Sequence, residues 1–181
     1  MGKSFICLDV INTMWYDYRG TGKSEDRLEN DKWLKLFIND WEVSHLPYPT
    51  ARNIKSLQQL RQLMRNIFKK TSENREPSSQ EIQTINDFMS KTKRKPTLIK
   101  KAESYELISK PLEDSWEAFI SEVALSFSNM FITNEYKRVK ICKNQDCLWV
   151  FYDDTKNGRK HWCSSEACGN LSRVRKHREN R

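Results

Sequence analysis

The chain has 181 residues, of which 37% are hydrophobic and 31% charged, and its formal net charge is +8. This length accommodates one ordinary domain with a small additional module, and six tryptophans and eight phenylalanines can supply a buried core. No apolar run approaches the roughly 18 residues of a membrane-spanning helix and no signal-peptide pattern is visible, so we expect a cytoplasmic protein with reduced thiols and no membrane partner.

The first feature along the chain is the segment LDVINT, residues 8–13, where polar side chains interrupt an apolar run. Asn12 or Thr13 can cap a helix there. Alternatively, the segment lines a small-molecule pocket with Asp9, Asn12 and Arg19 as its polar contacts. Cys7, which stands apart from the other cysteines, is expected to be a buried core residue.

Apolar side chains recur every three or four residues in four later segments, which predicts helices with one buried face. Ser78 and Glu81 form a capping box that opens the third of these helices. The stretch 15–31 is polar and is expected to be a loop, whereas 97–109 is expected to be a short strand or a hairpin. The predicted helices cover 33–41, 54–68, 78–89 and, as the longest, the segment from Pro111 to Phe131.

The remaining four cysteines form two matched pairs near the C-terminus, Cys142 with Cys147 and Cys163 with Cys168. Each pair can span one edge of the tetrahedron that Zn²⁺ prefers, so the pattern predicts one structural zinc per chain. Four thiolates fill the coordination shell and leave no open position for catalysis. Two disulfides, or four unrelated cysteines, are the alternatives.

The residues between the cysteine pairs support a compact module. Residues 148–153 are aromatic and β-branched, Asn157-Gly158 is a turn signal, and 159–162 can run back as the second strand of a hairpin. Ser164 or Ser165 then caps a helix that carries Cys168 in its first turn. We therefore predict a mainly α fold, with a helical N-terminal domain at 1–136 and a treble-clef-like module of β-hairpin plus helix at 137–181.

Nearly all of the excess positive charge lies in this module. Residues 137–181 hold 12 Lys and Arg against 5 Asp and Glu, a charge of +7, while the rest of the chain carries +1. Such asymmetry favours a polyanionic partner, although a solvated basic face is the simpler reading. The candidate nucleic-acid contacts are Lys143, Arg159, Lys160, Asn170, Arg173, Arg175, Lys176 and Arg178.

The roles of these contacts differ. Arg175 and Lys176 are expected to contact phosphates, whereas Asn170 and Arg173, near the start of the helix, are candidates for base edges. Asn170 can instead satisfy backbone groups beside the metal site. Leu171 and Val174 are expected to pack on the aromatic residues of the hairpin.

At Cys168-Gly169-Asn170, preceded by the FYDDTKNGRK hairpin, the module resembles the CGNR zinc finger, with Leu171 where that family has arginine. LDVINT resembles the Leu-Asp-x-x-Asn-Thr opening of the ABATE domain, which usually precedes this finger. The resemblance covers essentially the whole chain. It implies a bacterial, stress-induced transcription regulator.

These observations lead to one functional prediction. The protein is expected to bind duplex DNA through the finger, with the helical domain as a sensor of a small-molecule effector, and a homodimer is expected for tight binding. The alternative is a zinc-dependent module that binds RNA or protein. There is no phosphate-cradling glycine loop and no nucleophile elbow, so we expect no enzyme activity.

Overall fold

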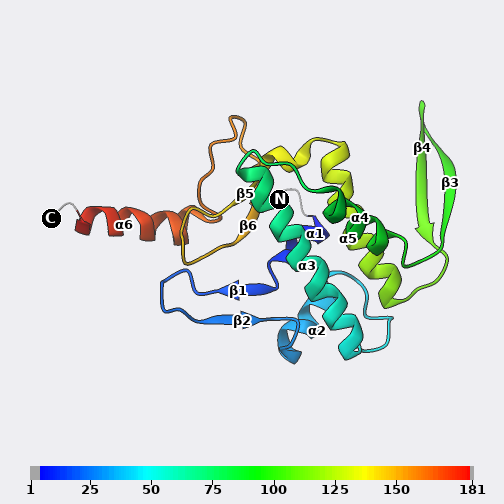
Figure 1. The fold of residues 1–181 in the computed structure, drawn as a ribbon, viewed down its shortest axis with the longest axis horizontal. Helices are drawn as coiled ribbons and strands as arrows, with labels where there is room; N and C mark the ends of the chain where they lie inside the picture. Colours follow the sequence, from blue (N-terminus) through cyan, green and yellow to red (C-terminus); the bar gives the residue numbers. More distant parts are fainter. Residues whose placement is uncertain (1–4, 180–181) are drawn as a thin grey trace.

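The computed structural model describes residues 5–179 and has a helical body with a small cysteine-bearing module, as the sequence predicts (Figure 1). The strands form three separate two-stranded antiparallel sheets within the described residues. The helices are α1 (Ile6–Ile11), α2 (Asp31–Asp40), α3 (Ala51–Ser72), α4 (Ser79–Met89), α5 (Trp116–Ile132) and α6 (Asn170–Glu179). The strands are β1 (Met14–Tyr16), β2 (Ser24–Asp26), β3 (Arg94–Lys101), β4 (Ser104–Pro111), β5 (Val139–Ile141) and β6 (Val150–Tyr152).

The core of the body lies where α1, α3, α4 and α5 meet. Leu57, Leu60 and Met64 of α3 are fully buried, and Phe127 of α5 packs edge-on against Phe68. These positions follow the spacing of three and four residues that places them on one helical face. The apolar stripes predicted from the sequence are therefore the core, and they leave the opposite faces for solvent.

Cys7 belongs to this core and not to the metal module. Its side chain is fully buried, and its Sγ contacts Sδ of Met130 at 3.6 Å. Burial raises the pKa of the Cys7 thiol to about 12, so the group stays protonated and apolar in character.

The predicted start is correct for α4 and wrong for α5. The capping box of Ser78 and Glu81 is present at α4. The last long helix does not begin at Pro111, because that residue pairs with Arg94 at the end of the β3–β4 hairpin. Ser115 caps α5 instead, through a bond from the amide N–H of Ala118. The longest helix is α3, with 22 residues against 17 in α5.

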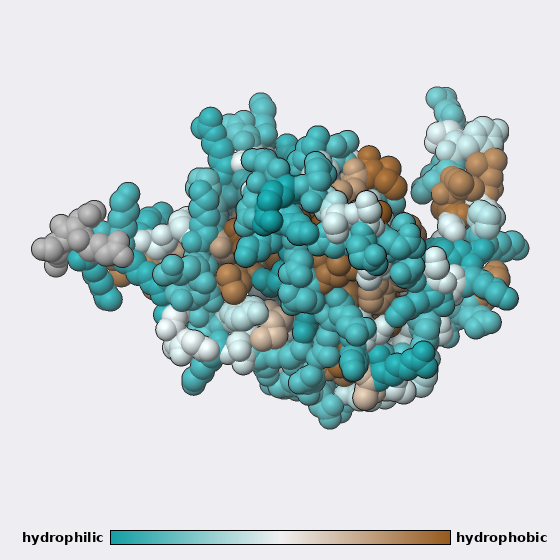
Figure 2. Space-filling view, in the orientation of Figure 1, coloured by the Kyte–Doolittle hydropathy of each residue, from teal (hydrophilic) through white to brown (hydrophobic). Residues whose placement is uncertain are grey.

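Two hairpins occupy the segments between the helices. The β1–β2 hairpin, from Met14 to Asp26, lies largely within 15–31, which the sequence predicted as a loop, and each of its strands has only three residues. The β3–β4 hairpin confirms the prediction for 97–109 and extends it at both ends. It projects from one end of the molecule and carries exposed apolar side chains, Leu98, Tyr105 and Leu107 (Figures 1 and 2).

The C-terminal module packs against the body on one side and projects on the other. Val139 and Val150, from β5 and β6, belong to the same buried cluster as the side chains of α3. Helix α6 extends away from the molecule, at the end opposite the β3–β4 hairpin (Figure 1). No helix among the described residues is long and apolar enough to cross a membrane.

Candidate metal centre

The four paired cysteines converge on one point of the module. Their Sγ atoms all lie within 4.8 Å of one another, with 3.6 Å between Cys147 and Cys163 and 3.7 Å between Cys163 and Cys168. A tetrahedron with Zn–S bonds of about 2.3 Å has S···S edges of about 3.8 Å. A disulfide requires about 2.05 Å, so the structure contradicts the alternative of two disulfides. The donor set fits Zn²⁺.

The first pair is held by a tight turn after β5. The amide of Cys142 donates to the carbonyl of Trp149 at 2.9 Å, and the amide of Cys147 donates to the carbonyl of Asn144 at 2.9 Å. Leu148 takes a positive φ of 52°, which turns the chain back into β6. The turn therefore presents both thiols on the same side.

The second pair is held by a helical turn, as predicted. The Ser164 hydroxyl accepts from the amide of Ala167 at 3.2 Å and caps a π-helical turn, Ser165–Gly169, that carries Cys168 into α6. Gly169 permits close packing there, because a Cβ at this position would lie 3.1 Å from Cδ1 of Trp162.

The thiols interact strongly with one another. Hydrogen bonds from Cys147 and then Cys163 lower the pKa of the Cys142 thiol well below its usual value. The pKa values of Cys147 and Cys163 are raised, because each thiol first of all donates a hydrogen bond to the Cys142 thiolate. A divalent cation at the centre of the four sulfurs would replace the thiol protons, because cysteines bind a metal as thiolates.

The predicted hairpin partner is wrong. Strand β6 pairs with β5 and not with 159–162, in a register that places Lys140 opposite Phe151. Segment 159–162 does return toward the cysteines, but it is held by single contacts, such as that from the amide of Lys143 to the carbonyl of His161 at 3.0 Å. The preceding segment pairs with β6 in place of the segment that follows the Asn157-Gly158 turn.

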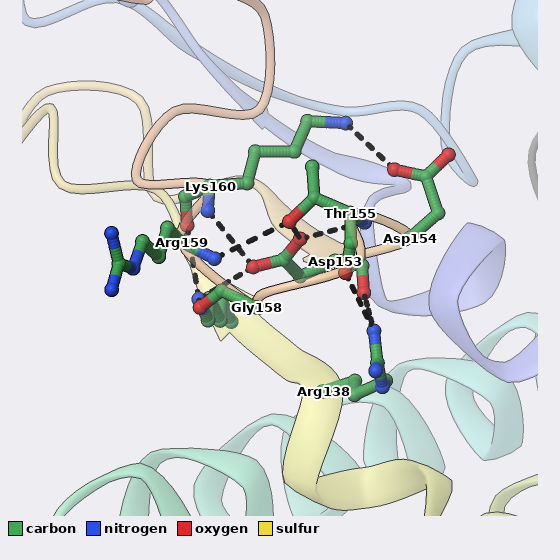
Figure 3. A network of polar contacts seen from close by, with 8 residues as sticks. Arg138, Asp153, Asp154, Thr155, Gly158, Arg159 and Lys160 are labelled. Atoms are coloured by element: carbon green, nitrogen blue, oxygen red, sulfur yellow. Dashed lines mark hydrogen bonds and ion pairs between the residues drawn. The ribbon is translucent and has the colours of Figure 1, made fainter.

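A buried carboxylate organises the returning loop (Figure 3). The side chain of Asp153 is fully buried and accepts from Nζ of Lys140 at 2.6 Å and from the amides of Thr155 and Lys160 at 3.0 and 2.9 Å. Desolvation raises the pKa of this carboxyl, but the bonds from Lys140 and Thr155 outweigh it and hold the pKa well below its usual value. Sequence reasoning missed Asp153, although Asp followed two residues later by Thr is a turn signal.

Asn12 connects the body to the metal module. Its Nδ2 donates to the carbonyl of Val150 at 2.8 Å, and its Oδ1 accepts from the amide of Val150 at 2.9 Å. Asn12 is the residue that ends α1, and no helix begins there. Asn12 is thus the C-cap residue of α1, but it caps through its backbone N–H, while its side-chain amide binds a strand 138 residues away.

Thr13 joins the same region to the helices. Its hydroxyl donates to the carbonyl of Val10 at 2.7 Å and accepts from Nη1 of Arg61 at 2.9 Å. Arg61, on α3, makes a two-bond ion pair with Asp26 of β2. The end of LDVINT thus links α1, α3, the β1–β2 hairpin and the cysteine module.

The predicted pocket exists in part. Asp9 and Asn12 line a cavity of about 560 Å³ together with side chains of α2 and of the module, among them Trp33 and Trp149. Arg19 does not line it. That residue is exposed in the β1–β2 loop, and its carbonyl faces α6. The structure therefore separates Arg19 from Asp9 and Asn12.

Most of the predicted nucleic-acid contacts are exposed on α6 and on the loops beside it. Asn170 has local partners, because it donates to the carbonyl of Glu166 at 2.8 Å and accepts from Arg173 at 2.5 Å. The backbone role considered for Asn170 is thus present. Lys160 is half-buried, with its Nζ 3.7 Å from Asp154. The exposed residues of the set are Lys143, Arg159, Asn170, Arg173, Lys176 and Arg178.

Arg175 has a different place from its neighbours. It forms an ion pair with Asp146 at 2.8 Å and donates to the carbonyl of Arg19 at 3.2 Å. Gly20, with a φ of +86°, permits this approach, since a Cβ there would lie 2.9 Å from the guanidinium. Arg175 therefore braces α6 against the β1–β2 loop and is not displayed as a phosphate contact.

The packing predicted for Leu171 and Val174 is not found, because neither residue belongs to an apolar cluster of the described residues. Leu171 is partly buried, but the side chain of Val174 is 46% exposed. Helix α6 projects from the rest of the molecule (Figure 1), which fits the exposure of Val174.

Two family models match the chain. Residues 6–125 match the ABATE model, whose description is "Putative stress-induced transcription regulator", and residues 138–181 match the CGNR zinc finger. No curated protein matches the sequence.

Proposed function

The chain belongs to the ABATE family and carries a CGNR zinc finger, and from this premise we propose that it regulates transcription by binding duplex DNA through α6. The observation that carries the proposal is the coincidence of charge and shape. Residues 137–181 carry +7 of the net +8 and end in a helix that projects from the body (Figure 1) with Arg173, Lys176 and Arg178 exposed. Such a distribution suits a phosphate backbone.

We propose that one Zn²⁺ is held by Cys142, Cys147, Cys163 and Cys168. The metal would fix the turn after β5 and the start of α6 relative to each other. With four thiolates in the shell it would have a structural role, so the protein is proposed to act by binding and not by catalysis.

Helix α6 has dimensions that suit a major groove. Its 10 residues give about 15 Å of length, and a groove about 12 Å wide accepts a helix. Lys176 and Arg178 are proposed as phosphate contacts on the helix, with Lys143 and Arg159 as phosphate contacts from the neighbouring loops. Arg173 and Asn170 are the candidates for base edges, once their mutual bond is exchanged for bonds to DNA.

The body is proposed to sense an effector and to pass its state to the finger. The two-point bond between Asn12 and Val150 gives a direct physical connection for this purpose. A single short helix offers a modest interface, so a homodimer on a two-part site is proposed for tight binding.

The test is a fluorescence-anisotropy titration of zinc-loaded, full-length protein against duplex DNA selected from a random pool, at several salt concentrations. If about five phosphates are neutralised, log affinity should fall with log salt with a slope of roughly −4 to −5. The double variant Lys176→Glu with Arg178→Glu should lose most of the binding, whereas Lys35→Glu with Lys55→Glu, an equal charge change on the body, should retain it.

The sequence readout has its own test. Arg173→Ala and Asn170→Ala should cost roughly 1–3 kcal/mol on the preferred duplex and little on other duplexes. If the double variant of α6 and the double variant of the body lost the same amount of DNA binding, the assignment of binding to α6 would be wrong. Binding to RNA or to an acidic protein with no binding to duplex DNA would establish the alternative, a zinc-dependent interaction module.

A further inference from the structure

The cavity beside Asn12 is lined mainly by aromatic and acidic side chains. Its volume of about 560 Å³ lies in the range of small-molecule sites, roughly 300–1,000 Å³. Three tryptophans line it: Trp33 lies on α2, Trp41 directly follows α2, and Trp149 belongs to the finger. The carboxylates Asp9 and Asp40 also line it. Aromatic faces with carboxylates form a setting that attracts cations.

One of these tryptophans already holds a cation. The guanidinium carbon of Arg27, the only basic group lining the cavity, lies 4.0 Å from the ring centroid of Trp33. The same guanidinium lies 5.7 Å from the ring of Trp15, on the strand side. A cation–π interaction therefore already occurs once in the cavity, between Arg27 and Trp33.

The two other tryptophans of the lining, Trp41 and Trp149, have no such partner among the described residues. In the part of the chain that the structure describes, the rings of Trp41 and Trp149 have no cationic group over them, and the exposed carboxylate of Asp40 forms no ion pair. Asp40 also lines the cavity, next to Trp41 in the sequence. A monovalent cation would pair with the carboxylate of Asp40, whereas an anion would be repelled by it.

We propose that this cavity binds a small organic cation, a substituted ammonium with an apolar body. The ammonium would lie near Asp40, over the indole faces of Trp41 and Trp149. The apolar body would replace water along the rest of the aromatic lining. The binding itself is independent of what the finger contacts, and its role as an effector site rests on the proposed regulation of transcription.

The position of Trp149 connects such a ligand to the finger. The carbonyl of Trp149 accepts from the amide of Cys142, and the next residue, Val150, is the one that Asn12 holds. A ligand between α2 and Trp149 therefore touches the body and the finger at once. Bound ligand should make zinc removal by a chelator slower, because opening the finger would then require its release.

The experiment is isothermal titration calorimetry of the zinc-loaded, full-length protein with three ring compounds of similar size. Benzyltrimethylammonium carries a positive charge, benzyl alcohol none and benzoate a negative charge. We expect benzyltrimethylammonium to bind at least about tenfold more tightly than either of the others. Equal affinities for the three compounds, or tighter binding of benzoate, would overturn the proposal.

Two variants locate the site. Asp40→Asn should weaken binding of the cation about fivefold to tenfold, with little risk to folding because the side chain is exposed. Asp114→Asn, an exposed aspartate between β4 and α5, is the matched control and should bind as the unchanged protein does. Equal loss or equal retention in both variants would contradict the assignment. The calorimetry contains no DNA, so it tests the cation site separately from the proposed regulation of transcription. A protein that binds the cation but no duplex DNA would contradict only the regulatory proposal.

Discussion

The helical body and the finger are stabilised by different means. The body has a core of fully buried apolar side chains from four packed helices. Its positive and negative charges nearly cancel. The finger buries few apolar residues, Val150 and Phe151 among them, and depends on four sulfurs and a buried carboxylate. A module this small cannot bury enough apolar area to fold on that basis alone, so polar and metal contacts have to supply the difference.

The finger also relies on the body. Asn12 binds the backbone of β6 twice, and Nη1 of Arg65 on α3 donates to the carbonyl of Leu148 at 2.9 Å. Val139 and Val150 complete the apolar cluster of the body. The charge composition changes near residue 137, but the apolar core continues across this point. A domain can differ sharply in charge from its neighbour and still share its interior.

The largest expected effect comes from the metal ligands. Cys168→Ser should abolish zinc binding and destabilise the finger by at least about 5 kcal/mol, because metal binding supplies its folding free energy. Zinc per chain measured by elemental analysis, with hydrogen exchange of α6, checks both. Cys7→Ala is the control and should retain a full complement of zinc. A freshly purified protein without zinc would refute the assignment.

The connection between the two regions comes next. Asn12→Ala leaves the amide and the carbonyl of Val150 buried without partners, which should cost about 2–4 kcal/mol of unfolding free energy. Urea denaturation gives the loss, and hydrogen exchange should show it concentrated in β5 and β6. Asn39→Ala, an exposed position on α2, should change stability little. A loss spread evenly over the body would mean that Asn12 does not connect the two regions.

The buried carboxylate of the finger predicts a pH dependence. Because the folded pKa of Asp153 is held below its unfolded value, its contribution is present above about pH 4 and is lost as pH falls through the folded pKa. Asp153→Asn should cost about 2 kcal/mol at pH 7. The difference between the two proteins should stay constant from pH 8 to 5 and shrink below about pH 4. A difference that grows on acidification would contradict this sign.

The smallest effect separates two neighbouring cations of α6. Arg175→Ala removes the brace to Asp146 and should lower stability by about 1 kcal/mol, the upper range for a half-exposed ion pair. Lys176→Ala should leave the melting temperature unchanged and should flatten the salt dependence of DNA binding by about one phosphate, near 0.9 in slope. The same result from both substitutions would show that Arg175 is not a brace.

The local features were predictable because local rules govern them. The spacing of Cys142, Cys147, Cys163 and Cys168 was sufficient to predict one cluster, and Ser78 with Glu81 was sufficient to predict where α4 begins. Cap bonds connect residues three apart, so the sequence holds all of their information. The start of α5 was placed too early for a related reason. Pro111 is compatible with the first turn of a helix and equally with the end of an edge strand.

What the sequence determined by itself is thus the set of apolar faces, the cap of α4 and the four cysteines that converge as candidate metal ligands. Only the tertiary structure decided that β6 pairs with β5, that Asn12 binds Val150 and that Arg175 turns inward. Each of these depends on which segments meet. A side-chain amide or a strand edge can bond to almost any backbone group, so its partner is selected by packing of the whole chain and cannot be read from spacing.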